Sequence, residues 1–340
     1  MGKQFDIIII GAGPAGLECA RVLKDSSLSV LILEKNEVIG PKTCAGGIVE
    51  TVEPLNLPDS KARTFGTLSA FIGRKKYDFN LDAPVRTIDR QALGQHQLQL
   101  LGNASNVTIK SGVMVRKIDK ECVITDLGEF YYHCLIGADG STSRVRRYLQ
   151  LDSKYMVGIY YDIQVWKDRM VFYLNGSSLK AGYIWEFPHQ QFTNIGFYYN
   201  PAYWKSKVAL QILKSYMRNR GYPIDPVTYR AFPISYLYKG SQFQQNIFLV
   251  GDAAGLASKL TGEGIAPAII SGREVARKIL TPRYDCKMLK AVVAHKNRQD
   301  NLMNVLEKIP FGLHLIYHIV LKALKFRILP WSHYSNAKIS

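Results

Sequence analysis

Three glycines and one acid near the N-terminus have a spacing that suits chemistry with phosphate and sugar groups. Gly11, Gly13 and Gly16 follow the pattern GxGxxG, and Glu34 lies 18 residues after the last of them. In this pattern the first glycine permits a tight turn, the second lets the backbone approach a pyrophosphate, and the third lets a helix pack on a strand. A carboxylate at the position of Glu34 can accept a hydrogen bond from a ribose hydroxyl. The four residues predict a dinucleotide site, against the alternative of chance glycines in an ordinary βαβ unit.

The residues around this motif predict the elements that must position it. Residues 7–10 are four consecutive isoleucines, as expected of a strand buried on both faces. Apolar residues recur at helical intervals over 15–23, and a second apolar run, 30–33, ends just before Glu34 and Lys35. Strand, glycine turn, helix, strand and acid is the order in which this motif binds a dinucleotide, with the helix N-terminus facing the phosphates.

A second chemically interesting loop contains a cysteine among small residues. Cys44 is followed by Ala45, Gly46 and Gly47, and Pro41 precedes the group. Adjacent glycines would let backbone amides approach a ligand. The thiol of Cys44 is either poised for chemistry or a small filler of a tight loop, and the sequence leaves both readings open.

Two aspartates follow apolar runs that read as strands. Asp139 precedes Gly140, and Asp252 follows Gly251. A glycine-rich turn, 261–265, then comes before a predicted helix. Open α/β sheets bind ligands at the carboxyl ends of their strands, where helix N-termini also favour anions. We therefore expect both aspartates near a ligand.

Two arginines mark the start of another predicted helix, 91–101. Arg86 and Arg90 flank residues that can cap this helix. The two guanidinium groups either hold a phosphate or the edge of a cofactor, or remain solvated charges at a helix start.

Aromatic residues crowd 155–200 in alternating patterns that predict a separate antiparallel sheet. Tyr183, Trp185 and Phe187 are two residues apart, so they share one face of a strand. That face either lines an apolar pocket or packs against a helix.

Charge and composition narrow the partners. The 340 residues carry a formal net charge of +17, which favours anionic partners such as membrane surfaces, nucleic acid or phosphorylated substrates. No helix-turn-helix, RRM or zinc-finger pattern is present, so nucleic acid is not expected. Five cysteines without CxxC spacing argue against a disulfide framework and a zinc site, and fit a reducing compartment. The first apolar run is too short for a signal peptide, and no run reaches the ~18 apolar residues of a certain membrane span.

The tail is basic and apolar. Residues 309–331 combine a strongly apolar pattern with Lys322, Lys325 and Arg327 near their end and Trp331 at the edge. Such a helix either lies in a membrane interface or packs on the core as a last helix. His314 and His318 are one turn apart, but no carboxylate or cysteine accompanies them, so no metal site is expected.

The three glycine-acid motifs, in this order, resemble the flavoprotein monooxygenase superfamily with the p-hydroxybenzoate hydroxylase fold. The resemblance implies that the first motif holds the ADP part of FAD, that the Asp139 motif contacts the pyrophosphate, and that Asp252 contacts the ribityl chain. It also predicts the fold class: α/β, with a Rossmann-like FAD-binding domain, an inserted antiparallel β-sheet substrate domain and a C-terminal helical tail. The expected domains are 1–150 with 230–282, then 151–229 with part of 50–86, and finally 283–340.

A narrower resemblance is to the geranylgeranyl reductase family, which reduces isolated double bonds of isoprenoid chains with FAD. It rests on KTCAGG (42–47), YIWEFP (183–188) with Gly196, and GDAAG (251–255) with TGEGI (261–265). The family has three glycines after the cysteine, whereas Ala45 takes the first position here. The expected FAD contacts are Gly11, Gly13, Ala15, Gly16, Glu34, Lys35, Cys44, Ala45, Gly47, Arg90, Asp139, Gly140, Gly251, Asp252, Gly264 and Ile265.

Reduction of an unactivated alkene needs a hydride and a proton together, in a dry pocket that positions the chain. Cys44 is the titratable residue of its loop, so we expect it to donate the proton or to shape the pocket. Tyr183 and Trp185 complete the expected catalytic set, with the aromatic sheet lining a lipid channel. NAD(P)H or another reductant, such as a reductant protein, would supply the electrons.

Two other functions remain open. An aromatic hydroxylase of the same fold would consume oxygen and NAD(P)H, whereas the cysteine loop and the YxWxFP motif favour the reductase. A flavin-holding protein without enzyme activity is the third reading. We expect a cytoplasmic monomer that acts on a hydrophobic isoprenoid or lipid-type substrate, peripheral on the anionic inner face of the cytoplasmic membrane.

Overall fold

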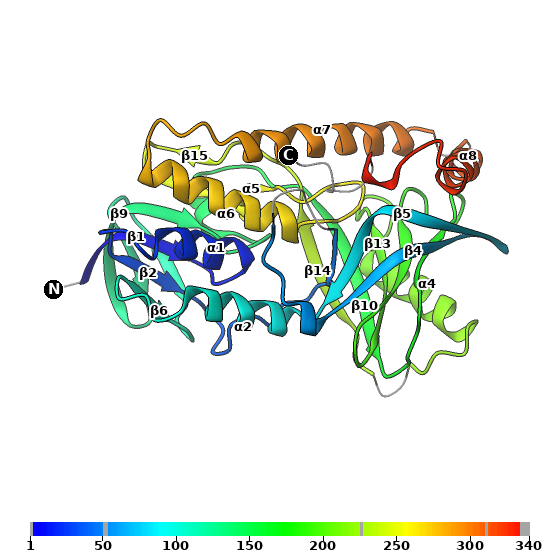
Figure 1. The fold of residues 1–340 in the computed structure, drawn as a ribbon, viewed down its shortest axis with the longest axis horizontal. Helices are drawn as coiled ribbons and strands as arrows, with labels where there is room; N and C mark the ends of the chain where they lie inside the picture. Colours follow the sequence, from blue (N-terminus) through cyan, green and yellow to red (C-terminus); the bar gives the residue numbers. More distant parts are fainter. Residues whose placement is uncertain (1–2, 50–53, 225–226, 310–311, 334–340) are drawn as a thin grey trace.

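The computed structural model describes residues 3–49, 54–224, 227–309 and 312–333, and its strands form two eight-stranded sheets (Figure 1). The first sheet contains the N-terminal strand, and the second lies beside it toward the opposite end of the molecule. The predicted α/β class, with a second sheet and C-terminal helices, is confirmed.

The first sheet has a parallel centre. Its order is β15-β16-β9-β1-β2-β6, with β7 and β8 forming an antiparallel extension of β9. The pairs β16/β9, β9/β1, β1/β2 and β2/β6 are all parallel. The strands are β1 (Lys3–Ile10), β2 (Val30–Leu33), β6 (Val107–Lys110), β7 (Val115–Ile118), β8 (Cys122–Thr125), β9 (Gly128–Gly137), β15 (Gln242–Phe243) and β16 (Ile247–Leu249).

The four isoleucines of β1 are buried on both faces of the sheet, as their run predicts. Ile7 and Ile9 belong to the core beneath α1 (Pro14–Leu23), while Ile8 and Ile10 belong to the core on the other face. Each is at most 5% exposed. Burial of four such side chains contributes about 1.5–3 kcal/mol each, which makes this strand the centre of the fold.

Helix α6 (Ile265–Leu280) packs directly on α1 because a glycine lies at their contact. A Cβ at Gly272 would lie 2.2 Å from the backbone oxygen of Ala15. The short α3 (Arg144–Tyr148) and α5 (Gly251–Ala254) follow the carboxyl ends of β9 and β16, and α2 (Arg90–Leu101) lies beside α1.

The second sheet is antiparallel with one exception, the parallel pair β4/β11. Its order is β14-β10-β13-β12-β11-β4-β5-β3. Strand β14 pairs with β10. The segment 230–282, expected in the FAD-binding domain, therefore begins with a strand of the second sheet. The strands are β3 (Gly47–Val49), β4 (Ala62–Ile72), β5 (Lys75–Ile88), β10 (Tyr155–Ile163), β11 (Met170–Leu174), β12 (Tyr183–Pro188), β13 (Thr193–Tyr199) and β14 (Arg230–Ser235).

The remaining helices cover this sheet. α4 (Ser206–Arg218) buries Ala209, Leu213 and Met217 against β10 and β13. α7 (Lys287–Glu307) runs along the molecule from α6 to α8 (Leu313–Lys325), and α8 packs on β4 and β5 (Figure 1). Within the described ranges, no helix has the length and hydropathy needed to cross a bilayer.

Candidate active site

The glycine turn after β1 adopts the conformation that its sequence predicts. Gly11 has φ +102°, and a Cβ there would lie 2.5 Å from the backbone oxygen of Ala138. A Cβ at Gly16 would lie 2.1 Å from the oxygen of Gly11. At Gly13, by contrast, a Cβ would meet nothing within 4 Å. Two glycines therefore permit close packing, and the third leaves the backbone open to a ligand.

Glu34 stands at the end of β2 and fastens this turn. Its Oε2 accepts a hydrogen bond from the amide of Ala12 (2.8 Å), and its Oε1 accepts one from the amide of Asn36 (2.9 Å). Each carboxylate oxygen has a second lone pair, so the group can still accept from a ribose hydroxyl. Glu34, Lys35 and Gly13 line a cavity of about 520 Å³ at the carboxyl edge of the first sheet.

Asp139 and Gly140 line the same cavity. Asp139 Oδ2 accepts from the amides of Arg144 (2.6 Å) and Val145 (3.3 Å) at the start of α3. Its Oδ1 is buried with no hydrogen-bond partner among the residues described. Burial raises the pKa of the Asp139 carboxyl, against the opposing effect of a hydrogen bond from the Ser143 side chain and of those from the two amides. A buried acceptor of this kind suits a ligand that brings its own donor.

Arg90 and Arg86, which the sequence leaves equivalent, have different surroundings. Arg86 pairs with Asp59 (2.5 Å). Arg90 is 7% exposed at the start of α2, and its Nε is buried without a partner in the described part of the chain. Arg90 also lines the cavity described above, so its guanidinium is the one available to a bound phosphate or ring edge.

A narrower cavity of about 70 Å³ continues from the first. Both are lined by Gly13, Lys42, Thr43, Arg90, Ala138 and Gly140. Across the narrow part, Lys42 Nζ forms an ion pair with Asp252 Oδ2 (3.0 Å), which also accepts from Ser141 Oγ (3.2 Å). A Cβ at Gly264 would lie 3.0 Å from Asp252 Oδ1, so the 261–265 turn comes close to the carboxylate only because glycine stands there.

The cysteine loop lines the narrow cavity at its far end. Cys44 Sγ accepts from the amide of Gly46 (3.4 Å), and the amide of Cys44 donates to the hydroxyl of Tyr160 (3.2 Å). His189 Nε2 donates to the oxygen of Ala45 (3.0 Å). The sequence motifs do not mark Tyr160 or His189, because each lies more than 100 residues from the loop that it holds.

An apolar cavity of about 290 Å³ begins at this loop. Cys44, Gly262, Gly264 and Ile265 line both it and the narrow cavity, so the three cavities form a continuous trough. The apolar part runs between the second sheet and the C-terminal helices. Its walls include Met170, Phe172, Tyr183, Trp185 and Phe187 from the sheet and Leu306, Ile316, Tyr317, Leu321, Leu324 and Trp331 from the C-terminal region.

The polar atoms of the aromatic wall form hydrogen bonds within the protein. The Tyr183 hydroxyl donates to the oxygen of Thr261, and Trp185 Nε1 donates to Asn194 Oδ1 (2.6 Å). Burial strongly raises the pKa of Tyr183, so its phenol stays protonated. Trp185 also needs Gly196 opposite it, because a Cβ there would lie 2.1 Å from the indole ring.

The described ranges contain no group of three or more His, Cys, Asp or Glu side chains that could hold a metal ion. His314 and His318 instead lie 3.3 Å apart through their Nε2 atoms, and His318 Nδ1 bonds the hydroxyl of Tyr77 (2.6 Å).

Known proteins match either the N-terminal segment of this chain or most of its length. The Thi4 family model matches residues 3–52, the segment that carries the glycine turn. An uncharacterized protein of Methanosarcina barkeri is 30% identical over 336 residues, covering 93% of this chain and 83% of its own. Digeranylgeranylglycerophospholipid reductases of Methanosphaera stadtmanae (27% identical, 83% of this chain, 80% of theirs) and Methanocella arvoryzae (26%, 91% and 89%) also match.

Solved structures share the fold. A geranylgeranyl bacteriochlorophyll reductase-like protein of Thermoplasma acidophilum superposes with a TM-score of 0.75 at 20% identity, over 100% of this chain and 94% of that one. The p-nitrophenol 4-monooxygenase of Pseudomonas putida gives 0.72 at 13% identity, over 99% of each chain.

The fold, together with the matches over most of the chain, identifies an FAD-dependent oxidoreductase. Within that class the chain belongs to the geranylgeranyl reductase family of FAD-dependent oxidoreductases.

Proposed function

We propose that this protein reduces carbon–carbon double bonds of an isoprenoid chain carried by a lipid. The observation that supports this most is the continuity of the trough. A polar cavity suited to a dinucleotide continues into the narrow cavity. At Cys44, Gly264 and Ile265 the narrow cavity meets an apolar cavity walled by aromatic and aliphatic side chains. An apolar substrate chain could therefore lie against the reactive ring of the cofactor. The relatives named as digeranylgeranylglycerophospholipid reductases point to the same substrate class.

The chain's residues fit FAD from one end of the trough to the other. Glu34 would accept from the adenosine ribose, and the amides around Gly13 would face the pyrophosphate. Arg90 and Lys42 would supply positive charge beside the diphosphate, while Asp252 would bond the ribityl hydroxyls. The remaining proposed contacts are Gly11, Ala15, Gly16, Lys35, Cys44, Ala45, Gly47, Asp139, Gly140, Gly251, Gly264 and Ile265.

Bound reduced FAD supplies a hydride to one alkene carbon. The other carbon needs a proton, and we assign that role to the Cys44 thiol, which lines both the narrow and the apolar cavity. The thiolate that is formed would recover its proton from solvent. Trp185 and Tyr183 act by excluding water and by holding the substrate wall and the 261–265 turn in place.

The electrons come from an external reductant, NAD(P)H or a reduced protein, which regenerates the reduced flavin after each turnover.

We also propose that the monomer docks on anionic bilayers at the inner face of the cytoplasmic membrane. Helix α8 supports this because Leu315 and Ile319 are 64% and 58% exposed beside Lys322, whereas Leu321 and Leu324 line the apolar cavity. One helix would thus face lipid on one side and substrate on the other.

The test is reoxidation of the flavin without oxygen. The purified protein should be yellow and should release one noncovalent FAD per chain on denaturation. After anaerobic reduction, an unsaturated isoprenoid lipid should reoxidise the flavin, and its fully saturated counterpart should not. Turnover that depends on oxygen, with a hydroxylated product, would instead identify a monooxygenase. A protein that binds no flavin would refute the whole assignment.

A further inference from the structure

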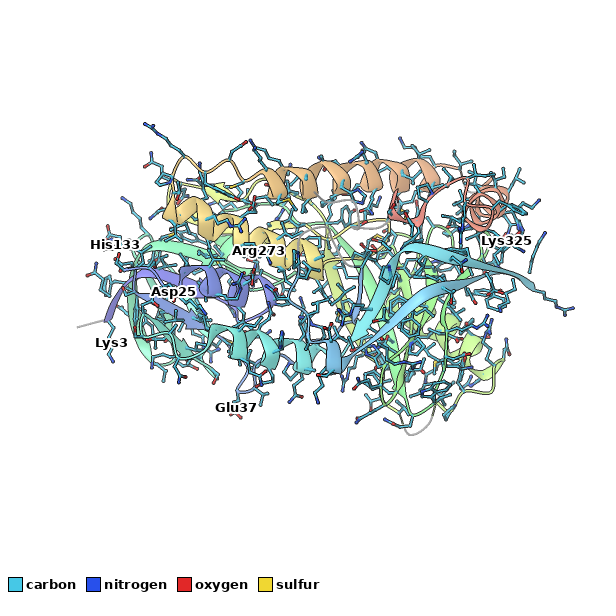
Figure 2. The ribbon with its side chains drawn as sticks, viewed as in Figure 1. Lys3, Asp25, Glu37, His133, Arg273 and Lys325 are labelled. Carbon is cyan, nitrogen blue, oxygen red and sulfur yellow. The ribbon has the colours of Figure 1, made fainter. Side chains whose placement is uncertain are left out.

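A further cavity of about 240 Å³, outside the trough, lies where β4 and β5 meet the chain that follows α8. It differs from the apolar cavity in chemistry, because three cationic side chains line it: Arg169, Lys325 and Arg327. One carboxylate, Asp78, lies among them. Figure 2 shows Lys325 at the end of the molecule opposite to Lys3 and His133 of the first sheet. The cationic cavity is therefore remote from the FAD end of the trough.

The cationic cavity adjoins the apolar one through shared and consecutive residues. Phe79 lines both cavities. Leu324 and Met170 line the apolar cavity, and their neighbours in sequence, Lys325 and Arg169, line the cationic one. Thr67 and Leu68 also line one cavity each, but as consecutive residues of β4 they point to opposite faces of the sheet. A molecule in the apolar cavity could thus place one end among the cations while the rest of it extends toward Cys44.

The charges of this cavity do not cancel. Asp78 is already compensated, since it accepts from Ser69 Oγ (2.6 Å) and pairs with Lys76 (3.0 Å) and Arg169 (3.6 Å). Neither Lys325 nor Arg327 has an ion-pair partner in the part of the chain that the structure describes. The end of α8 carries a partial negative charge, but full positive charges on side chains outweigh it. The surplus suits an anion, and guanidinium groups favour phosphate oxygens.

Arg327 stands at a position where glycine would be more favourable. The end of α8 is a Schellman motif, in which the amide of Ile328 donates to the oxygen of Ala323 (2.9 Å) and that of Arg327 to the oxygen of Leu324 (3.1 Å). Arg327 takes the left-handed position of this motif with φ +57°. This backbone conformation is strained for a residue with a long side chain. Arg327 nevertheless occupies the position, and it lines the cationic cavity.

We propose that the cationic cavity binds the phosphate or diphosphate group of the isoprenoid substrate. The polar end of the substrate then lies at α8, and its chain lies in the apolar cavity with double bonds directed toward Cys44. This inference rests on the proposed reductase function and adds a substrate orientation and two binding residues, Lys325 and Arg327, to it. The occupant is the anionic end of a lipid rather than a free anion, because the apolar cavity beside it has room for the attached chain.

The test compares a charged and a neutral ligand with the same chain. Farnesyl diphosphate and farnesol are measured by equilibrium dialysis on the FAD-loaded full-length protein, at fixed ionic strength. We expect the wild type to bind the diphosphate at least tenfold more tightly than the alcohol. The double variant Lys325→Gln/Arg327→Gly should lose most of that preference and bind the alcohol unchanged. Glycine suits the left-handed position, so the variant should melt no lower than the wild type.

A matched control removes the same charge elsewhere. Lys308→Gln/Lys322→Gln changes two cations that do not line the cavity, one just after α7 and one in α8, and it should keep the preference for the diphosphate. Equal affinity of the wild type for both ligands, or an equal loss in the control, would overturn the inference. So would inorganic pyrophosphate binding as tightly as farnesyl diphosphate, because the cavity would then be a site for a free anion.

The proposed function is tested separately by anaerobic reoxidation of the reduced flavin. If farnesol and farnesyl diphosphate reoxidise it equally well in wild type and double variant, the reductase stands and the anion site falls. If the diphosphate preference depends on Lys325 and Arg327 but no isoprenoid reoxidises the flavin, the anion site stands and the reductase falls.

Discussion

The hydroxyl of Tyr183 donates a hydrogen bond to the backbone oxygen of Thr261. This bond ties the aromatic wall of the second sheet to the glycine-rich turn that comes close to Asp252. Tyr198 adds a second hydrogen bond nearby, because its hydroxyl donates to the oxygen of Lys259 (2.9 Å), two residues before this turn. The wall of the substrate cavity and the proposed ribityl contact are thereby parts of one rigid unit.

Tyr183→Phe should loosen that unit without emptying the cavity. The ring stays, and one buried hydrogen bond is lost, so we expect the free energy of unfolding to fall by about 1 kcal/mol and FAD to bind several-fold more weakly. Urea unfolding and flavin titration measure the two effects. Tyr317→Phe, whose hydroxyl donates to the oxygen of Lys180 (3.3 Å), is the control and should leave FAD affinity unchanged. Equal FAD losses in both variants would show that the Thr261 bond does not position the turn.

Glu34→Gln should weaken FAD binding by roughly ten- to a hundredfold, because a charge-assisted hydrogen bond contributes about 1.5–3 kcal/mol. Gln is preferable to Ala here, because its one side-chain oxygen can still accept from the amide of Ala12 or of Asn36, whereas Ala would lose both of these hydrogen bonds. The nearby exposed Glu37, labelled in Figure 2, provides the control Glu37→Gln. Unchanged FAD affinity in Glu34→Gln would remove the ribose contact.

Cys44→Ser should retain FAD and slow reoxidation by an unsaturated isoprenoid by at least tenfold, since a hydroxyl is a far weaker acid than a thiol and proton transfer typically contributes 10²–10⁴-fold. Single-turnover absorbance under anaerobic conditions follows the step. Cys122→Ser, in β8 and outside the trough, is the control. Wild-type rates in Cys44→Ser would exclude the thiol as the proton donor.

His189 should make stability depend on pH. Burial lowers the pKa of His189 below its ordinary 6.5, although the bond to Ala45 opposes the shift. The unfolded chain therefore takes up a proton at His189 before the folded protein does, so stability present above 6.5 is lost as the pH falls through the lowered pKa. Urea unfolding between about pH 5 and pH 7 should show this loss in the wild type and a smaller one in His189→Gln. The exposed His133→Gln should behave as the wild type, and parallel pH profiles for wild type and His189→Gln would contradict the assignment.

Membrane docking is tested on the outer face of α8 rather than by truncation. Removal of the tail would open the apolar cavity, because Leu321 and Leu324 line it. Leu315→Ser/Ile319→Ser should lower flotation with anionic vesicles at least tenfold, as each buried aliphatic side chain contributes up to about 1.5–3 kcal/mol. Added salt should weaken wild-type binding, since each cation near the surface contributes about 1 kcal/mol. The equally exposed Leu127→Ser is the control, and unchanged flotation of the α8 variant would refute docking by this face.

Local patterns predict the fold and much of the proposed cofactor set. The isoleucine run, the glycine turn and Glu34 lie within 35 residues, so their spacing alone indicates a βαβ unit. Contacts between distant segments have no such signal. The bond of His189 to the Ala45 loop, the packing of Gly272 on Ala15 and the parallel pairing of β4 with β11 all depend on how separate parts of the chain meet.

The C-terminal tail is a second feature whose packing the sequence does not predict. Its sequence leaves two alternatives, interface or core, and in the structure one helix has both a buried and an exposed apolar face: Leu321 is 5% exposed and Leu315 is 64% exposed. Sequence patterns do not predict the cationic cavity, because Arg169 lies just before β11, more than 150 residues before Lys325.

The mass of the product of one anaerobic turnover tests the central claim most directly. Reduced, FAD-loaded protein is mixed with an unsaturated isoprenoid lipid without oxygen, and the lipid is extracted and weighed by mass spectrometry. We predict a product in which one double bond has gained one hydride and one proton for each flavin reoxidised. An unchanged lipid beside a flavin that stays reduced, or a product that appears only with oxygen and carries an added oxygen atom, would contradict the account.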